Sequence, residues 1–480
     1  MCGISGFITK KNSSNNLKIL KDMVSSLSHR GPDNKGYWSD VHNKQFLGHS
    51  RLSILDLSQN GNQPMISSSG RYIISYNGEI YNHLEIREKI RNIKKVIWKS
   101  TSDTETILEA IEIYGLKKTI SILHGMFSMC IIDKKKSSLF LIRDKYGEKP
   151  LYYGFSNSTF LFGSELKSII SYPNFEKKIN YKSLNYFFSL SYIPEPFSIF
   201  ENISKILPGS ILNFNLNDHK VLGYEYYDTI CNKDETEFKN SNLSDEFDKL
   251  INTVVKDTLI SDVEVGSFLS GGLDSSLITS VMQKQSLNKI KTFSVVFDDN
   301  KFDEKFYSRN ISEYLNTDHN ELLLKSKDLI DASKIISDVY DEPFADSSQI
   351  PTILISKFAS KKVKVILSGD GADEFYGGYS RYIGFSKIDK LMPYCPFSFR
   401  FFLGKIISKL PYELLTNMEI TLGKIFKHNR SITQLDDKIK KLGNILINSK
   451  NITDMYYSII SLSENTINLL KNENSKNQII

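Results

Sequence analysis

The chain contains 480 residues, of which 40% are hydrophobic and 24% are charged, and its formal net charge is +6 at pH 7. This length is sufficient for two or three domains with a large core. A small net charge, with lysines scattered between acidic residues, excludes a surface dedicated to nucleic acid or to an anionic membrane. The apolar runs fall short of the ~20 residues that span a bilayer, and the amino terminus does not resemble a signal peptide. We therefore expect a cytoplasmic protein with no nucleic-acid partner and no membrane partner.

The first 215 residues consist mainly of short apolar runs separated by turn residues, a pattern typical of strands. Helical patterns interrupt these runs near 17–27, 82–89 and 103–114. We predict a domain over residues 1–215 with a layered αββα arrangement. Residues 216–242 are polar, and we interpret them as a linker.

Residues 243–480 show a different pattern, in which strands rich in valine and isoleucine alternate with helices. Such alternation predicts a second domain built on a parallel α/β sheet with helices on both faces. Strands are expected over 263–268, 291–297, 321–324 and 362–368. Helices are expected over 245–259, 274–286, 327–340 and 347–359, and a further helix is expected to begin after residue 303. Beyond about residue 385 the pattern predicts trailing helices, and the polar end NENSKNQII is expected to fray.

The four cysteines, Cys2, Cys130, Cys231 and Cys395, are too few and too scattered for a disulfide framework or a zinc site. Cys130 lies in the apolar run GMFSMCII, which indicates a core residue. Cys2 differs, because removal of the initiator methionine would give this one residue both a thiol and an α-amine. The unperturbed pKa values, near ~8.5 and ~8, allow the amine to serve the thiol as a base. The alternative is that a small residue occupies position two by chance.

Polar residues farther along the first half are candidates to complete a site around Cys2. Asn77 and Gly78 offer a side-chain amide and a backbone N–H for an oxyanion. Arg51 can clamp a carboxylate through two hydrogen bonds, while Glu79 and Asp103 can receive an α-ammonium group. These residue types predict a pocket for a free amino acid whose side-chain carbonyl meets a thiolate. Their spacing alone does not establish that they converge.

The stretch Val263–Ser276, VEVGSFLSGGLDSS, predicts a strand, a tight turn and the start of a helix. Gly271 and Gly272 permit a turn that side chains would block. Backbone N–H groups at the loop and helix start would face an anion, and the serine hydroxyls can donate to the same oxygens. We interpret the stretch as a nucleotide phosphate site, and an ordinary strand–turn–helix connection is the alternative.

A second glycine cluster, SGDGADEFYGGY over 368–379, directly follows the apolar run KVKVIL. Loops at the carboxyl ends of parallel strands form the crevice in which such sheets bind ligands. Carboxylates beside a polyphosphate imply Mg²⁺, because like charges would otherwise repel. We predict Asp274 and Asp373 as metal ligands, and a solvated acidic turn is the alternative.

Several segments of the first half resemble, in order, the glutaminase domain of class II, N-terminal-nucleophile amidotransferases: MCGISGF, HRGPDNKG, GHSRLSI, YNGEIYNH, SDTE, RDKYGEKPLYY and FGSELKSI. The resemblance implies that Cys2 attacks the glutamine amide, forms a thioester and releases ammonia, with its α-amine as the base. It also implies an oxyanion hole formed by Asn77 and Gly78, and structural roles for His29 and His49. The implied glutamine-binding residues are Arg51, Leu52, Ser53, Ile54, Leu55, Asn77, Gly78, Glu79 and Asp103.

Segments of the second half resemble the ATP-pyrophosphatase domain of glutamine-dependent asparagine synthetases: SFLSGGLDSS, TFSVVF, DEPFADSSQIPT and VILSGDGADEFYGGY. Enzymes of this type adenylate the aspartate β-carboxylate, release pyrophosphate and let ammonia displace AMP. The resemblance implies glutamine, aspartate and ATP as substrates, Mg²⁺ as cofactor and an apolar passage for ammonia, and it is compatible with a homodimer. The implied ATP-binding residues are Leu269, Ser270, Gly271, Gly272, Asp274, Ser275, Ser276, Val295, Ser368 and Gly369, and Asp370 is the implied catalytic residue.

The chain departs from this family pattern at two places. Many asparagine synthetases carry glutamate at the position of Asp370, and the GDG form is common among bacterial relatives, including those that modify surface sugars. A later helical segment with a DR-S-A-S-E-R-P-LD type signature is not found, so we expect a synthetase half that is shortened at its carboxyl end. Three alternatives therefore stay open: amidation of another carboxylate, for example on a surface-polysaccharide sugar; a glutaminase with a defective synthetase half; and a degenerate binding or regulatory protein.

Overall fold

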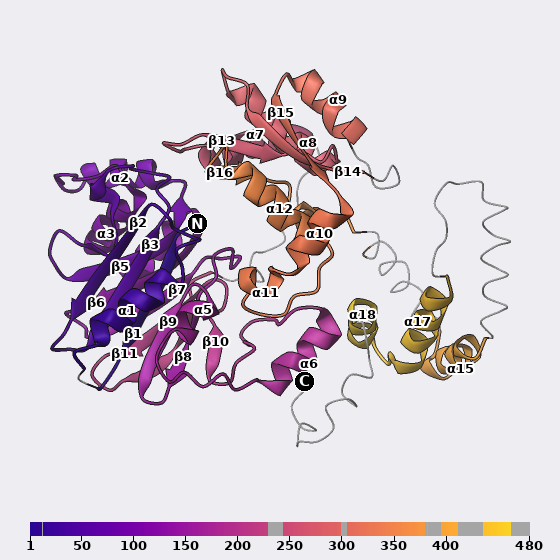
Figure 1. The fold of residues 1–480 in the computed structure, drawn as a ribbon, viewed down its shortest axis with the longest axis horizontal. Coiled ribbons are helices and arrows are strands. Elements are labelled where there is room, and N and C mark those ends of the chain that lie inside the picture. Colours follow the sequence, from indigo (N-terminus) through magenta and orange to yellow (C-terminus); the bar gives the residue numbers. More distant parts are fainter. Residues whose placement is uncertain are drawn as a thin grey trace. The chain divides into compact units, whose positions relative to one another are not determined.

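The computed structural model describes residues 1–11, 13–228, 243–298, 305–379, 382, 395–410 and 435–461 (Figure 1). The chain divides into two compact units, of which the first comprises Met1–Leu184 and Ile193–Gly369 and the second Asn185–Tyr192 and Asp370–Ile480. The first unit contains all three sheets of the structure. The domain limit at residue 243 stays a prediction. Within the described ranges, no helix combines the length and the apolar character that a bilayer crossing requires.

The amino-terminal half forms two six-stranded antiparallel sheets. The first has the order β10-β8-β9-β1-β3-β2, with β1 (Gly3–Ile8), β2 (Asn34–Asp40), β3 (Gln45–Arg51), β8 (Tyr152–Ser156), β9 (Thr159–Gly163) and β10 (Ile203–Lys205). The second has the order β12-β11-β7-β6-β5-β4, with β4 (Met65–Ile66), β5 (Tyr72–Ile80), β6 (Gly125–Asp133), β7 (Ser138–Arg143), β11 (Ser210–Asn215) and β12 (Lys220–Tyr226).

Strand β12 corrects one expectation, because we interpreted the whole of 216–242 as a linker. Lys220–Tyr226 pairs with β11 and ends the second sheet, with a register shift between Asn213 and Phe214. Most residues of β12 are exposed, so the sequence lacks the buried apolar alternation that marks an inner strand. Residues 229–242 of the predicted linker lie outside the described residues.

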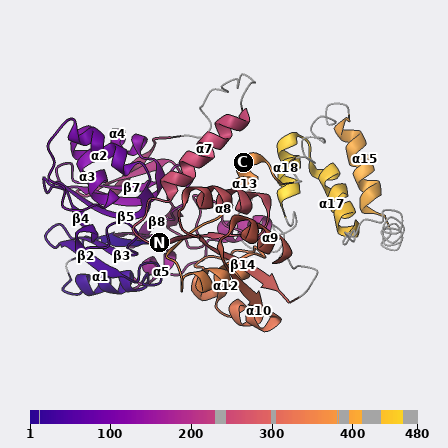
Figure 2. The ribbon, with the colours of Figure 1, turned by 90° about the horizontal axis from the view of Figure 1, so that it is seen from above.

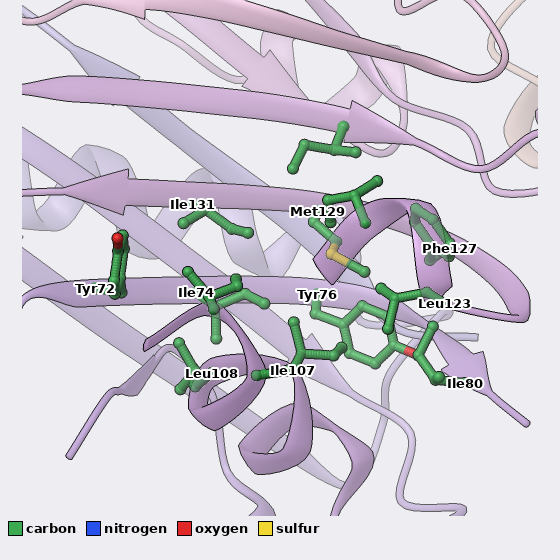
Figure 3. Packing of buried hydrophobic residues seen from close by; sticks show 14 of the residues in the cluster. Tyr72, Ile74, Tyr76, Ile80, Ile107, Leu108, Leu123, Phe127, Met129 and Ile131 are labelled. Atoms are coloured by element: carbon green, nitrogen blue, oxygen red, sulfur yellow. The ribbon is translucent and has the colours of Figure 1, made fainter. Parts of the chain in front are cut away.

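Strands β5 and β6 carry the core because their successive side chains point to opposite faces of the second sheet. Ile73 and Cys130 belong to the cluster shared with the first sheet. Ile74 and Met129 belong to the cluster on the other face, together with Ile107 of a covering helix (Figure 3). Cys130 is fully buried, as predicted, and burial raises the pKa of its thiol well above the ordinary value.

Helices cover both outer faces of the paired sheets. Helix α1 (Asn16–Ser25) packs on β1 and β3, and α3 (Asp103–Tyr114) packs on β5 and against α2 (His83–Arg91) and α4 (Leu116–Ile122). The resulting order of layers, visible in Figure 2, confirms the predicted αββα sandwich. Helix α3 begins at the predicted residue because Ser102 caps it, its hydroxyl accepting a hydrogen bond from the Thr104 N–H. Short elements complete this half: the 3₁₀ helix η1 (Gln59–Gly61), α5 (Leu166–Ile170) and α6 (Tyr181–Leu190).

The second half contains the predicted parallel sheet, in the order β15-β14-β13-β16. Its strands are β13 (Val265–Phe268), β14 (Lys291–Phe297), β15 (Asp318–Leu324) and β16 (Val365–Leu367). Its helices are α7 (Leu243–Thr258), α8 (Leu273–Gln285), α9 (Lys305–Leu315), α10 (Ser326–Ser333), α11 (Ile336–Val339) and α12 (Gln349–Ala359). Val265 and Leu367 pack with α7 and α8, whereas Phe268 and Ile366 pack with α12, so helices cover both faces.

The helix predicted over 327–340 is in fact two helices, α10 and α11. The N–H groups of Lys334 and Ile335 bond to carbonyls three residues earlier, those of Asp331 and Ala332. This tighter pattern interrupts the α-helical ladder between the two segments.

The described part of the second unit is helical, as the sequence predicts. It includes α13 (Ala372–Tyr376), α15 (Phe397–Ser408), α17 (Leu435–Asn448) and α18 (Ile452–Ile460). The buried Arg400 of α15 donates to the carbonyl oxygens of Cys395 at 3.0 Å and Ser449 at 2.9 Å, which ties α15 to the end of α17.

Candidate functional site

An open pocket in the amino-terminal half brings together eight of the nine residues predicted to bind glutamine, and Cys2 with them. Its empty space is about 550 Å³, which includes solvent at the open mouth. Its lining comprises Met1, Cys2, Arg51, Leu52, Ile54, Leu55, Gly61, Gln63, Tyr76, Asn77, Gly78, Glu79, Ser102, Asp103, Thr104, Met126 and Lys149. Ser53 is the predicted residue that does not line the pocket.

Strand pairing explains why these distant residues meet. Gly3 of β1 pairs with Ser50 of β3, so Cys2 lies beside the end of β3 and the loop that follows. Strand β5 of the other sheet brings in residues 77–79. A Cβ on Gly78 would lie 2.2 Å from the Met126 carbonyl oxygen, so only glycine leaves the two backbones this close.

The Cys2 thiol is held against the loop that follows β3. The Leu52 N–H points at Sγ with an N···S distance of 3.4 Å, and the Arg30 side chain donates to the Cys2 carbonyl oxygen at 2.8 Å. Burial raises the pKa of the Cys2 thiol. Burial also lowers the pKa of the α-amine of Met1 to about 6, with smaller contributions from the cations Arg30 and Lys149. Burial at the chain start therefore favours the neutral form of the Met1 amine.

Asn77 presents a buried hydrogen-bond donor to the pocket. Its side-chain nitrogen Nδ2 is buried and makes no hydrogen bond within the described residues, and the residue lines the pocket. A buried donor without a partner costs about 1–3 kcal/mol. A ligand oxygen in the pocket can remove this cost, so the geometry suits an oxyanion next to Cys2.

The acidic side of the pocket consists of Glu79 and Asp103. Asp103 accepts hydrogen bonds from the Tyr76 hydroxyl at 2.8 Å and from the Ile80 N–H at 3.0 Å. Burial first, and then the Asp103 carboxylate, raise the pKa of Glu79 to about 8. A cationic group bound between the two carboxyl groups would favour the ionised form of Glu79.

Arg51 is arranged differently from the predicted carboxylate clamp. Its Nη1 donates to the Ser58 carbonyl oxygen at 2.8 Å and to Asn62 Oδ1 at 2.7 Å, and its Nη2 donates to the carbonyl oxygens of Leu55 and Asp56. These bonds fold the loop after β3 around the guanidinium. A bound carboxylate would have to share Arg51 with this loop.

Sequence reasoning missed several further pocket residues, among them Gln63 and Lys149. Gln63 accepts a hydrogen bond from the Tyr76 N–H at 2.7 Å, and Lys149 is almost fully buried beside the chain start. Lys149 lies in the quoted segment RDKYGEKPLYY, but nothing in the spacing assigns it to the pocket. The two predicted structural histidines lie outside the pocket lining: His29 contacts Glu165 at 2.9 Å, and His49 contacts the Tyr76 carbonyl oxygen at 2.9 Å.

The second predicted site lies where β13 ends. Gly271 has φ +83, a left-handed conformation that favours glycine, and α8 starts at Leu273. The Ser275 hydroxyl lies 3.0 Å from the Ser270 hydroxyl and folds the loop back on itself. The buried Ser276 hydroxyl makes no hydrogen bond within the described residues, and Asp274 lies in the first turn of α8.

The parallel sheet brings the other predicted nucleotide residues to the same edge. Strands β13, β14 and β16 are neighbours, so Leu269, Val295 and Ser368 lie at or near their carboxyl ends. A Cβ on Gly369 would lie 2.9 Å from the Asp274 Cβ, so the end of β16 contacts the start of α8. Asp370 and Asp373 belong to the second unit, and their roles stay predictions. The described residues contain no group of three or more metal-ligating His, Cys, Asp or Glu side chains.

The chain combines a two-sheet sandwich that holds a cysteine-lined pocket with a parallel sheet whose strand β13 leads through a glycine turn into α8. The glutamine amidotransferase domain family matches residues 1–227, and the asparagine synthase family matches residues 246–461. Its two family matches define a two-part amidotransferase. The putative glutamine-hydrolysing asparagine synthetase 2 of Methanocaldococcus jannaschii is 38% identical over 434 residues, which cover 86% of this chain and 81% of that protein. The chain belongs to the glutamine-hydrolysing asparagine synthetase family, whose enzymes are ATP-dependent ligases.

Other relatives are matched over a smaller share of their own length. Asparagine synthetase 1 of Bacillus subtilis is 35% identical over 385 residues, which cover 80% of this chain and 59% of that protein. Among solved structures, the glutamine phosphoribosylpyrophosphate amidotransferase of B. subtilis matches with 14% identity and a TM-score of 0.37, over 67% of this chain and 81% of that chain.

The raised pKa of Glu79 gives a pH-dependent stability that can be measured. The pKa of Glu79 is 4.5 ordinarily and about 8 in the folded chain. At a pH between these two pKa values, Glu79 loses its proton in the unfolded chain and keeps it in the folded chain. Stability attributable to Glu79 is therefore present below the lower value and is lost as pH rises through this window. The Glu79→Gln variant does not lose this stability. Calorimetry should therefore show that its unfolding temperature exceeds that of wild type by an amount that grows from pH 5 to pH 8 and is constant at higher pH. The exposed Glu88→Gln serves as control, and an excess for Glu79→Gln that does not change with pH would contradict the assignment.

Proposed function

We propose that this chain makes asparagine from aspartate, with glutamine as the nitrogen donor and ATP as the activating substrate, through two linked half-reactions. Glutamine is hydrolysed in the Cys2 pocket, and the released ammonia attacks an aspartyl adenylate formed at the loop of residues 270–276. The products are asparagine, glutamate, AMP and pyrophosphate. The observation that carries the proposal is the buried side-chain nitrogen Nδ2 of Asn77, which makes no hydrogen bond within the described residues and belongs to a residue that lines the same pocket as Cys2.

The first half-reaction uses Cys2 as nucleophile. Its Sγ attacks the carboxamide carbon of glutamine, and the thiol proton passes through the α-amine to the departing nitrogen, which leaves as ammonia. Asn77 Nδ2 and the Gly78 N–H donate to the oxyanion of the tetrahedral intermediate. Water then hydrolyses the thioester to glutamate and restores the thiol. This role of the amine requires removal of Met1.

The remaining pocket residues fit the amino-acid part of glutamine. Glu79 and Asp103 receive its α-ammonium group, and the resulting opposite charge favours ionised Glu79. Arg51 holds its α-carboxylate while also bonding the loop after β3. Leu52, Ile54 and Leu55 supply the apolar wall of the pocket.

In the second half-reaction the aspartate β-carboxylate attacks the α-phosphorus of ATP, and pyrophosphate leaves. Ammonia then attacks the acyl carbon and AMP departs. Ser270, Ser275 and Ser276 donate to the pyrophosphate oxygens, as does the start of α8. Leu269 and Val295 flank the nucleotide, Ser368 and Gly369 line its site, and Asp370 assists at the acyl carbon.

We propose Mg²⁺ as a metal that this site shares with the substrate. Mg²⁺ in nucleotide sites usually takes one or two carboxylates and completes its coordination with phosphate and water. Asp274, in the first turn of α8, and Asp373 would hold it, and when bound the ion offsets the charge of the polyphosphate. We also propose a cytoplasmic location and a homodimer.

The direct test is product formation. Purified protein supplied with glutamine, aspartate and Mg-ATP should yield asparagine and AMP in equal amounts, measured by chromatography. Pyrophosphate release that is not stimulated by aspartate would contradict aspartate as the acceptor and would favour another carboxylate.

Replacing the nucleophile should separate the two half-reactions. Cys2→Ala should abolish glutamine hydrolysis and leave asparagine synthesis from added ammonium unchanged, because the nucleotide site is not altered. Both rates can be measured by glutamate and asparagine release, with Cys395→Ala as control. Glutamine hydrolysis that persists in Cys2→Ala would sink the assignment of Cys2.

Removing the unpartnered amide should affect the transition state more than binding. Asn77→Ala should lower kcat for glutamine hydrolysis by about 10²–10³, as expected for an oxyanion donor, with a small change in KM. Steady-state kinetics with Asn43→Ala, an exposed asparagine, as control would check this. A kcat close to that of wild type would remove Asn77 from the oxyanion hole.

The role of Asp274 can be examined apart from glutamine. Asp274→Asn should raise the Mg²⁺ concentration needed for half-maximal, ammonium-dependent synthesis by roughly tenfold or more, since one carboxylate ligand is lost. Glutamine hydrolysis should be unchanged, and Asp331→Asn on the exposed face of α10 is the control. An unaltered Mg²⁺ dependence would show that Asp274 is not a ligand.

A further inference from the structure

The loop Leu52–Asp56 forms one wall of the glutamine pocket, and its outer side is bonded to the second half of the chain. Leu52, Ile54 and Leu55 line the pocket. Two exposed residues far away in sequence support this loop: Asp262 bonds its backbone directly, and Lys364 bonds Asp33, which accepts a hydrogen bond from the Ser53 N–H. Residues of the second half of the chain therefore help to hold one wall of the pocket in the first half.

Asp262 holds the far end of the loop at two points. Its carboxylate Oδ2 accepts a hydrogen bond from the Asp56 N–H at 2.7 Å, and its own N–H donates to the Ile54 carbonyl oxygen at 3.0 Å. A carboxylate that accepts from a backbone N–H makes a charge-assisted hydrogen bond, stronger than one between neutral groups.

Lys364 reaches the near end of the loop through Asp33. The Asp33 Oδ2 atom accepts from the Ser53 N–H at 2.9 Å and from the Lys364 ammonium at 2.8 Å. Burial opposes ionisation, but the bonds from Lys364 and Ser53 hold the pKa of Asp33 below its ordinary value. Asp33 therefore stays charged at neutral pH and connects Lys364 to the loop.

We propose that Asp262 and Lys364 are positioning residues for glutamine, which hold the Leu52–Asp56 loop in the conformation that binds substrate. This inference rests on the proposed glutamine hydrolysis at Cys2 and extends it to residues of the synthetase half. Neither residue lines the pocket, so each acts through the loop.

The attachment of the two halves does not depend on these bonds. Glu342 accepts hydrogen bonds from the Ile199 N–H at 2.8 Å and pairs with the Lys205 ammonium at 2.8 Å, and both side chains of this pair are about nine-tenths buried. Asp341 accepts from the Lys167 N–H at 2.7 Å. Removing the side chain of Asp262 should therefore loosen the loop without separating the halves.

The test compares kinetic constants in the full-length chain. Asp262→Ala and Lys364→Met should each raise KM for glutamine at least threefold, the double variant should raise it further, and kcat should change less than twofold. Asp262→Asn keeps an oxygen that accepts from the Asp56 N–H, so it should restore most of the affinity. Synthesis from added ammonium should equal that of wild type in every variant. Glu264→Ala is the matched control, since Glu264 is exposed two residues away and pairs with Lys291 instead.

Each alternative result overturns the inference in a distinguishable way. An unchanged KM in Asp262→Ala and Lys364→Met would show that the loop needs no support. Equal losses of glutamine-dependent and ammonium-dependent synthesis, with a lower unfolding temperature, would show a purely structural role. Absence of glutamine hydrolysis in the wild-type chain would instead overturn the proposed function itself.

Discussion

The unpartnered amide of Asn77 is the constraint on which the candidate site depends. Strand β5 holds this residue in place, because Asn77 pairs with Ser128 of β6 in a sheet that is covered on both faces. The backbone therefore cannot move to give Nδ2 another partner at low cost. The Asn77 donor is therefore held at the pocket before any ligand arrives. Such preorganisation is what makes an oxyanion site effective, since no reorganisation is needed during the reaction.

The electrostatics of the pocket follow from burial around this fixed donor. The Cys2 thiol, the amine at the chain start and Glu79 are all pushed toward their neutral forms by burial. Burial therefore removes charge from these three groups, and the pocket, which Arg51 and Asp103 also line, gains charge when a zwitterionic amino acid enters. Opposite charges then meet in a poorly solvated space, where their interaction is stronger than in water.

Sequence reasoning located the elements better than the contacts among them. Helix α3 and its first residue were predictable because Ser102 and the apolar spacing are local signals, and the strand, glycine turn and helix of residues 263–276 likewise depend on neighbours in sequence. The exposed strand β12 and the break between α10 and α11 were not predictable, because pairing with β11 and a change of hydrogen-bond register leave no apolar pattern. Spacing could suggest the pocket residues, but only the pairing of β1 with β3 and the packing of β5 show that they meet.

Arg51 and Asp262 show where single-sequence reasoning ends. An arginine near acidic residues suggests a carboxylate clamp, yet the Nη atoms of Arg51 bond the loop of residues 55–62. The same loop is bonded through Asp56 to Asp262, which lies 206 positions farther along the chain. Asp262 lies three residues before β13, and Lys364 lies directly before β16. These strands are neighbours, and their opposite ends lead into the loop of residues 270–276 and into Ser368 and Gly369. The wall of the Cys2 pocket and the loop of the predicted nucleotide site are therefore attached to opposite ends of β13 and β16. A displacement of either strand would change both sites.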